Sequence, residues 1–208
     1  MNRLRRTFLS LLAVVFVLGA GMAAAQDYTY DIGYFTNART AGAPSAHLRL
    51  SNDGNDSAAP LCANLYVFDT QGEMAECCSC QITANGYLDL SVSTSLLGNM
   101  LDDGTAPTRG IVKEVSSAVP SGGICDPASE SPAAGSGAAT TAPEAGIKGW
   151  LTHVQKGAAA GAYNLTDTAL TDATLSSTEL NFNLELTCFF VHWLGSPTGV
   201  CSCTDAGD

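Results

Sequence analysis

Short runs in which apolar and polar residues alternate make up much of the chain after residue 45. Alternation with a period of two predicts β-strands that bury one face, and clusters of Gly, Asn, Asp and Pro between the runs predict turns. The predicted strands cover residues 47–51, 62–69, 73–83, 87–93, 109–119 and 149–155. Thr70-Gln71-Gly72 separates the second run from the third, so these two runs predict a hairpin.

The segment from Gln26 to Ala38, QDYTYDIGYFTNA, is rich in aromatic residues. This composition predicts an extended segment, and the Gly and Pro residues that follow, up to residue 44, predict a tether. We therefore expect an N-terminal strand and tether over residues 26–44, followed by a single β-rich domain over residues 45–208.

A helical pattern replaces the alternation near the C-terminus. Ser176 and Glu179 have the spacing of a capping box, and Gly195 suits a helix end. Apolar residues recur every three or four positions between them, at Leu180, Leu184, Cys188 and Val191. The pattern favours a helix with one buried face, but the run LNFNLELTC over residues 180–188 also alternates as in a strand, so a strand stays the alternative over residues 184–194.

Several short strands and one late helix predict a mainly β fold: a disulfide-stapled antiparallel β-sandwich with one C-terminal helix. Residues 120–146 interrupt the pattern, because they consist largely of Pro, Ala, Gly, Ser and Thr. A low-complexity stretch of this length predicts a mobile loop, with Cys125 as its anchor.

The first 25 residues have the layout of a signal peptide. Arg3, Arg5 and Arg6 precede an apolar run over residues 9–18, and three alanines end at Ala25. The layout predicts cleavage before Gln26 and export to the extracellular space or cell surface, with the periplasm as an alternative. Arg5-Arg6 also fits a twin-arginine motif, so both the general and the twin-arginine export routes stay open.

The acidic net charge of the chain disfavours polyanions as binding partners. Cleavage would remove three arginines and leave six basic residues against 20 acidic ones, a formal charge of -14. Such a chain is a poor partner for nucleic acid and for anionic membranes. No later stretch approaches about 18 consecutive apolar residues, so we expect no membrane contact after cleavage.

The eight cysteines are the strongest chemical signal in the chain. They are Cys62, Cys77, Cys78, Cys80, Cys125, Cys188, Cys201 and Cys203. An even number of cysteines in an exported chain predicts disulfides.

One disulfide follows from the predicted hairpin. If residues 70–72 form a three-residue loop, Asp69 faces Glu73 and Cys62 faces Cys80. Residues that face each other in antiparallel strands have Cα atoms about 4.5–5.5 Å apart, which a disulfide accepts. This register predicts the Cys62–Cys80 disulfide.

The same register predicts partners for the other cysteines of ECCSC. It places Met74, Cys78, Cys80 and Ile82 on one face of the strand and Cys77 on the other. Cys77 and Cys78 should therefore bind partners in different layers. The candidates are Cys125, Cys188, Cys201 and Cys203.

A metal site is the alternative for these cysteines. The clusters CCxC and CxC, together with His47, His153 and His192, offer ligands for zinc or copper(I). The paired CxxC units typical of zinc sites do not occur, so disulfides are favoured and no cofactor is predicted.

Other motifs add little. The chain has no nucleophile elbow and no phosphate-binding loop, so we expect no enzymatic activity. Asn55 in DGNDS and Asn164 in NLT fit glycosylation acceptor sequences.

Three blocks of sequence carry a resemblance. LCANLYVFD, ECCSC with ITANG, and LGSPTGVCSC resemble uncharacterised cysteine-rich secreted bacterial proteins. The resemblance implies no activity. The leading hypothesis is an exported bacterial structural protein, such as a filament or surface-layer subunit, that self-assembles through the strand Gln26 to Ala38. Pairing of this strand within its own domain is the competing interpretation. The alternative is an extracytoplasmic module that binds metal or a small ligand through its cysteine clusters.

Overall fold

The computed structural model describes residues 28–55, 58–101, 107–128, 143–176, 178–196 and 198–204. The predicted signal peptide and residues 129–142 of the predicted mobile loop lie outside this part of the chain.

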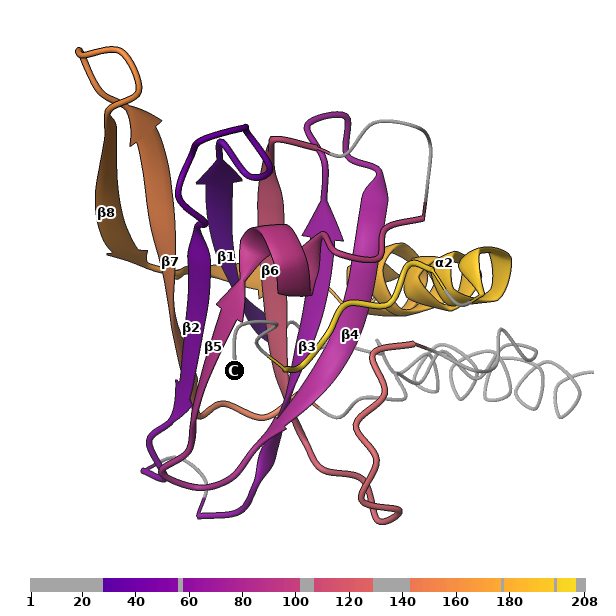
Figure 1. The fold of residues 1–208 in the computed structure, drawn as a ribbon. Coiled ribbons are helices and arrows are strands. Elements are labelled where there is room, and N and C mark those ends of the chain that lie inside the picture. The colour runs from indigo at the N-terminus through magenta and orange to yellow at the C-terminus, as the bar shows by residue number, and fades with distance from the viewer. Residues whose placement is uncertain are drawn as a thin grey trace, which may run out of the picture.

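Nine strands in the described residues form two antiparallel sheets (Figure 1). Sheet A contains, in spatial order, β4 (Met74–Ile82), β3 (Leu61–Phe68), β6 (Arg109–Ala118), β1 (Tyr28–Thr36) and β9 (Thr171–Leu175). Sheet B contains β5 (Tyr87–Ser91), β2 (His47–Asn52), β7 (Ile147–Lys156) and β8 (Tyr163–Ala169). Three helical segments complete the fold: η1 (Val92–Leu96) and η2 (Glu179–Glu185), which are π-helical, and α2 (Leu186–Gly195). The predicted mainly β fold with one C-terminal helical region is confirmed.

The core has two parts, one on each face of sheet A. Between the sheets, Phe35 and Leu65 of sheet A belong to the same buried cluster as Leu48 and Leu151 of sheet B. On the other face, the C-terminal helical region covers sheet A with a second cluster that includes Tyr66, Val115, Leu180, Leu184 and Val191. Because both faces of sheet A are covered, seven of the eight residues of β3 are buried instead of every second one.

The C-terminal helix begins where the sequence predicts. The hydroxyl of Ser176 accepts a hydrogen bond from the backbone N–H of Glu179, at 3.1 Å. Leu180, Leu184, Cys188 and Val191 are all buried, as the predicted helical face requires. No described helix has the length and apolar character that crossing a bilayer demands.

Strand β1 lies inside sheet A. It pairs with β6 on one side and with β9 on the other, and Phe35 is fully buried. In this structure, residues 28–36 therefore complete the sheet of their own chain.

The predicted hairpin of β3 and β4 is present, but its register changes along its length. Next to the turn, the backbone N–H of Asp69 donates to the carbonyl of Glu73 at 3.0 Å, and Phe68 faces Met74. The register then shifts between Phe68 and Val67, because Val67 faces Glu76 and leaves Ala75 as an extra residue. This β-bulge moves every later pair by one position.

Strands β8 and β9 have no counterpart among the strands that the sequence predicts. Residues 163–169 are almost all exposed, so β8 lacks the alternation of buried and exposed positions that marks a strand. Its backbone is nevertheless ordered by pairing with β7, from Trp150 with Ala169 to Lys156 with Tyr163. Leu170, between β8 and β9, is buried.

Candidate functional site

All eight cysteines form disulfides. The pairs are Cys62–Cys125, Cys77–Cys188, Cys78–Cys201 and Cys80–Cys203. Cys77 and Cys78 bind partners in different layers, as predicted: Cys77 joins the helix α2, and Cys78 joins the C-terminal segment. Four disulfides indicate that the protein folds in an oxidising, extracytoplasmic environment.

The predicted Cys62–Cys80 disulfide is wrong, and the β-bulge explains why. Beyond the bulge, Cys80 faces Ala63 and Cys62 faces Gln81. Neighbouring residues of a strand point to opposite faces, so a shift of one residue separates the two sulfurs. The bulge also places Met74 in the outer cluster with Cys77, and not with Cys78 and Cys80 as predicted.

Cys62 instead fixes the beginning of the predicted mobile loop. Its disulfide to Cys125 lies beside a hydrogen bond of 2.9 Å from the Tyr66 hydroxyl to the carbonyl of Pro127. Ala128 is buried in the outer cluster. Residues 125–128 are thus held against sheet A, whereas residues 120–124 are exposed and residues 129–142 lie outside the described part of the chain.

The C-terminal segment lies along the edge strand β4. Val200 forms a parallel bridge with Cys77, and the Cys77 N–H donates to the carbonyl of Gly199 at 3.0 Å. The disulfides of Cys201 and Cys203 tie the same segment to Cys78 and Cys80. This cover protects an edge that would otherwise offer free backbone groups to another strand.

One histidine adjoins a disulfide. Nε2 of His192 lies 3.1 Å from Sγ of Cys77 and 3.7 Å from Sγ of Cys188. These three side chains could ligate one metal ion if the disulfide were open, because two sulfurs and one imidazole are a common zinc donor set. Cys78, Cys80 and Cys203 form a second group of three sulfurs, which belong to two disulfides.

The other two histidines take no part in these groups. Nδ1 of His47 pairs with a carboxylate oxygen of Asp89 at 2.7 Å. The ring of His153 stacks on Tyr34, with centroids 4.0 Å apart, and its Nε2 contacts the Thr168 hydroxyl. Burial lowers the pKa of His153. The set of three histidines considered from sequence is therefore not assembled around the cysteines.

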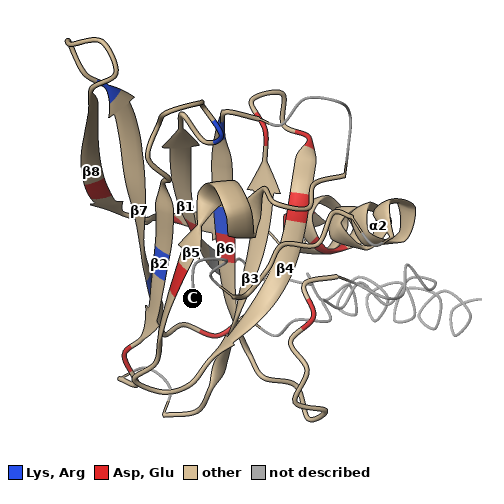
Figure 2. Ribbon diagram, in the orientation of Figure 1, with Lys and Arg blue, Asp and Glu red and all other residues tan. Residues whose placement is uncertain are grey.

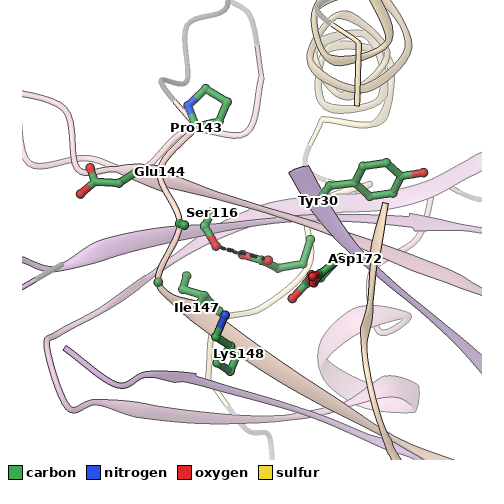
Figure 3. Close-up of a pocket in the computed structure, with 11 residues that line it drawn as sticks. Tyr30, Ser116, Pro143, Glu144, Ile147, Lys148 and Asp172 are labelled. Atoms are coloured by element: carbon green, nitrogen blue, oxygen red, sulfur yellow. Dashed lines mark hydrogen bonds between the residues drawn. The ribbon is translucent and has the colours of Figure 1, made fainter. Parts of the chain in front are cut away.

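Residues of both sheets line a pocket of about 390 Å³ (Figure 3). Three acids on neighbouring strands line it, because Asp31 of β1 faces Glu114 of β6 on one side and Asp172 of β9 on the other. Lys148, at the start of β7, also lines the pocket. The Ser116 hydroxyl donates to Glu114 Oε1 at 3.1 Å, which Figure 3 shows as a dashed line.

Two acids of this row, Glu114 and Asp31, resist ionisation. Burial and, to a smaller extent, the charge of Asp31 raise the pKa of Glu114 to about 8, against the opposing effects of the Ser116 hydrogen bond and the Lys148 charge. Burial and the hydrogen bond and charge of Asp172 raise the pKa of Asp31 to about 6. Like charges on directly opposed residues repel, so a proton kept on the row stabilises the sheet. No local pattern in the chain indicates this row, since its three acids come from segments far apart in the sequence.

The two glycosylation candidates are both accessible. Asn55 lies in an exposed turn, where its N–H donates to Asp53 Oδ1 at 2.9 Å. Asn164 lies on the exposed strand β8. Exposure is what a glycosylation acceptor needs.

The helical region exposes a set of large apolar side chains on its outer side, which we call the helix patch. It consists of Phe182, Phe190, Trp193 and Leu194, which are exposed by 43% to 67%. Phe190 makes an edge contact with Phe189, which in turn packs against the outer cluster. Figure 2 shows α2 as a ribbon without Lys, Arg, Asp or Glu.

Comparison with known proteins gives no match. No family model, no curated protein and no solved structure matches this chain.

Proposed function

We propose that the protein is an exported structural subunit that associates with copies of itself. Three features support the proposal: the signal-like N-terminus, four disulfides and the helix patch. The helix patch is the observation that carries it, because large apolar side chains gathered on an exposed surface favour association with another surface.

The distribution of charged residues on the chain favours a second copy as the partner that binds the helix patch. Away from the helix patch, two copies of so acidic a chain repel each other. The segment Leu186–Gly195 contains no acidic or basic residue except His192, so two copies can meet there without opposing charges. A basic partner would instead prefer the acidic remainder of the surface, and an anionic membrane would be repelled by it.

The helical region that carries the helix patch is fastened to sheet A. The Cys77–Cys188 disulfide joins α2 to β4, and Lys113 of β6 binds Glu179 at the start of η2, with Nζ and Oε1 2.5 Å apart. A surface that is fixed before association loses little conformational entropy when it binds. Most of the free energy gained by burying the large side chains of the helix patch is therefore available to stabilise the association.

Exchange of strand β1 is the second route to the same function. Since β1 is paired on both sides within its own chain, assembly through Gln26 to Ala38 requires β1 to leave its sheet and enter that of a neighbour. The linker between β1 and β2, which includes Asn37, Arg39 and Gly42 with positive φ angles, would have to reopen. We place this route second because it first breaks two sets of strand pairs.

Light scattering of the mature protein over a range of concentrations tests the proposal. We expect the apparent mass to rise with concentration, and to rise more steeply at high salt, which screens the acidic repulsion. Trp193→Glu should weaken association by about 100-fold or more, because each copy would bring a charge into the contact. Leu165→Glu adds the same charge on exposed β8 and serves as the control.

The outcomes separate the routes. A monomer at every concentration rejects self-association. Association that survives Trp193→Glu, and that does not reverse on dilution, points to exchange of β1, since leaving the neighbour's sheet requires partial unfolding.

A further inference from the structure

The Cys77–Cys188 disulfide and His192 form a compact group between sheet A and the C-terminal helix. Cys188 and His192 are four residues apart on α2, so their side chains lie on the same side of the helix. Cys77 reaches them from β4. Both cysteines are fully buried, while His192 is half-buried.

The imidazole is aimed at the sulfurs and not at solvent. Its Nε2 lies 3.1 Å from Cys77 Sγ, 3.7 Å from Cys188 Sγ and 3.0 Å from the carbonyl oxygen of Cys77. All three potential ligand atoms lie within 4.8 Å of one another. Two thiolates and one imidazole at such separations can converge on one ion, because Zn–S and Zn–N bonds are about 2.3 Å and 2.0–2.1 Å long.

We propose that the dithiol form of the protein binds Zn²⁺ through Cys77 Sγ, Cys188 Sγ and His192 Nε2. An external dithiol opens the disulfide by exchange: the S–S bond gains two electrons and two protons, and the dithiol becomes a disulfide. Zn²⁺ then displaces the two thiol protons and binds both thiolates and the neutral imidazole. Water completes four-coordination from the exposed side of His192.

This group is a better metal site than the second sulfur group. A single two-electron reduction frees both of its sulfurs, since they belong to one disulfide. Cys78, Cys80 and Cys203 become available together only when two disulfides are open. The second group also lacks an imidazole, and a nitrogen ligand lets the site bind a dication with less negative charge.

Metal binding would have a structural consequence. In the oxidised form, the disulfide fastens α2 to β4, and in the reduced form, Zn²⁺ would fasten the same two elements through the same side chains. The helix could thus keep its position in either redox state. The site therefore goes beyond the proposed self-association and does not depend on it.

Cobalt substitution and zinc competition test the proposal on the full mature chain. The protein is reduced with a phosphine under metal exclusion, and Co²⁺ is added alone, since a sulfur-to-cobalt absorption band reports thiolate ligation. Zn²⁺ should abolish the band, and one high-affinity zinc equivalent should disappear when Cys77 and Cys188 are both replaced by alanine. The oxidised protein should show neither signal.

Variants assign the ligands. His192→Ala leaves the cysteines intact and should weaken zinc binding by about 100-fold, because loss of a group that merely supports a ligand already costs 10- to 100-fold. His47→Ala removes a histidine that pairs with Asp89 on sheet B and should not change the affinity. The double variant Cys80→Ala/Cys203→Ala breaks the second group and should retain the zinc equivalent.

Reoxidation gives an independent readout. Non-reducing peptide mapping measures how fast the Cys77–Cys188 disulfide forms again after the reductant is removed. Zn²⁺ should slow this reoxidation in the natural chain but not in His192→Ala. The proposal is overturned if the reduced chain does not bind Zn²⁺, if His192→Ala binds it unchanged, or if binding is lost only when Cys80 and Cys203 are replaced.

Discussion

Cys80 faces Ala63 across the β3–β4 ladder, one position away from Cys62. The offset comes from Ala75, the extra residue of the bulge near the turn. It frees Cys80 to bind Cys203 at the C-terminus and Cys62 to bind Cys125 in the long loop. One inserted residue thus joins two remote segments to the hairpin instead of closing the hairpin on itself.

Deleting Ala75 should leave the pairing of the cysteines unchanged. Met74 faces Phe68 and Glu76 faces Val67, so removal of the residue between them gives a regular ladder with the same register beyond it. The carbonyl of Ala75 accepts a hydrogen bond from Leu101 at 3.2 Å, and its loss should cost about 1 kcal/mol of the free energy of unfolding. Non-reducing peptide mapping should find the same four disulfides. A Cys62–Cys80 peptide would show that the bulge does not set the register in this way.

Replacing both Cys77 and Cys188 by alanine should lower the free energy of unfolding by about 2–5 kcal/mol. The disulfide closes a sequence separation of 111 residues, and it fastens the helix to sheet A. Chemical denaturation measures the loss, and the double variant Cys80→Ala/Cys203→Ala is the matched comparison, with a separation of 123 residues. Only the first variant should also release α2, seen as faster amide hydrogen exchange over residues 186–195. Equal exchange in the two variants would contradict a special role for Cys77–Cys188.

Stability should fall as the pH rises from about 6.5 to 8.5. Burial raises the pKa of Glu114 to about 8 and that of Glu76 to about 7, well above their unfolded values. A raised carboxyl pKa contributes stability that is complete below the unfolded pKa and is lost as the pH rises through the folded pKa. His153 acts in the opposite direction, because its lowered pKa weakens the fold only as the pH falls below about 6.5.

Urea denaturation at several pH values measures this slope, and Glu114→Gln should flatten it because glutamine cannot ionise. Glu144→Gln removes one negative charge from an exposed position on the rim of the same pocket and is the control. A slope that Glu114→Gln leaves unchanged would mean that Glu114 is already ionised at pH 6.5.

Gly149→Val should destabilise the sandwich by about 1–3 kcal/mol. A Cβ atom on Gly149 would lie 2.4 Å from Leu170 Cδ1, and one on Gly33 would lie 2.5 Å from Leu170 Cδ2. Leu170 therefore occupies the space that these two glycines leave open between the sheets. Leu170→Ala alone should cost about 2–5 kcal/mol. Thermal unfolding of the double variant should give a loss smaller than the sum of the two, since each change relieves the other, and strict additivity would refute this contact.

Elements with local signals could be predicted from the amino-acid sequence alone. Alternation located the hairpin of β3 and β4, and the capping pair Ser176 and Glu179 located the start of the C-terminal helical region, because neighbours in the chain create these patterns. The opposite faces of Cys77 and Cys78 also follow from strand geometry alone, so their partners in different layers could be predicted.

Which distant groups meet depends on the packing of remote segments, which no local pattern specifies. The residue type of Ala75 does not indicate a bulge. The bulge nevertheless shifts the pairing of β3 and β4 by one residue, so that Cys62 faces Gln81 and the Cys62–Cys80 prediction is wrong. The acid row of Asp31, Glu114 and Asp172 exists because β1 enters the sheet between β6 and β9, which no local pattern specifies. His192 meets Cys77 across 115 residues for the same reason: packing of the helix on sheet A, not spacing in the chain, brings the imidazole to the disulfide.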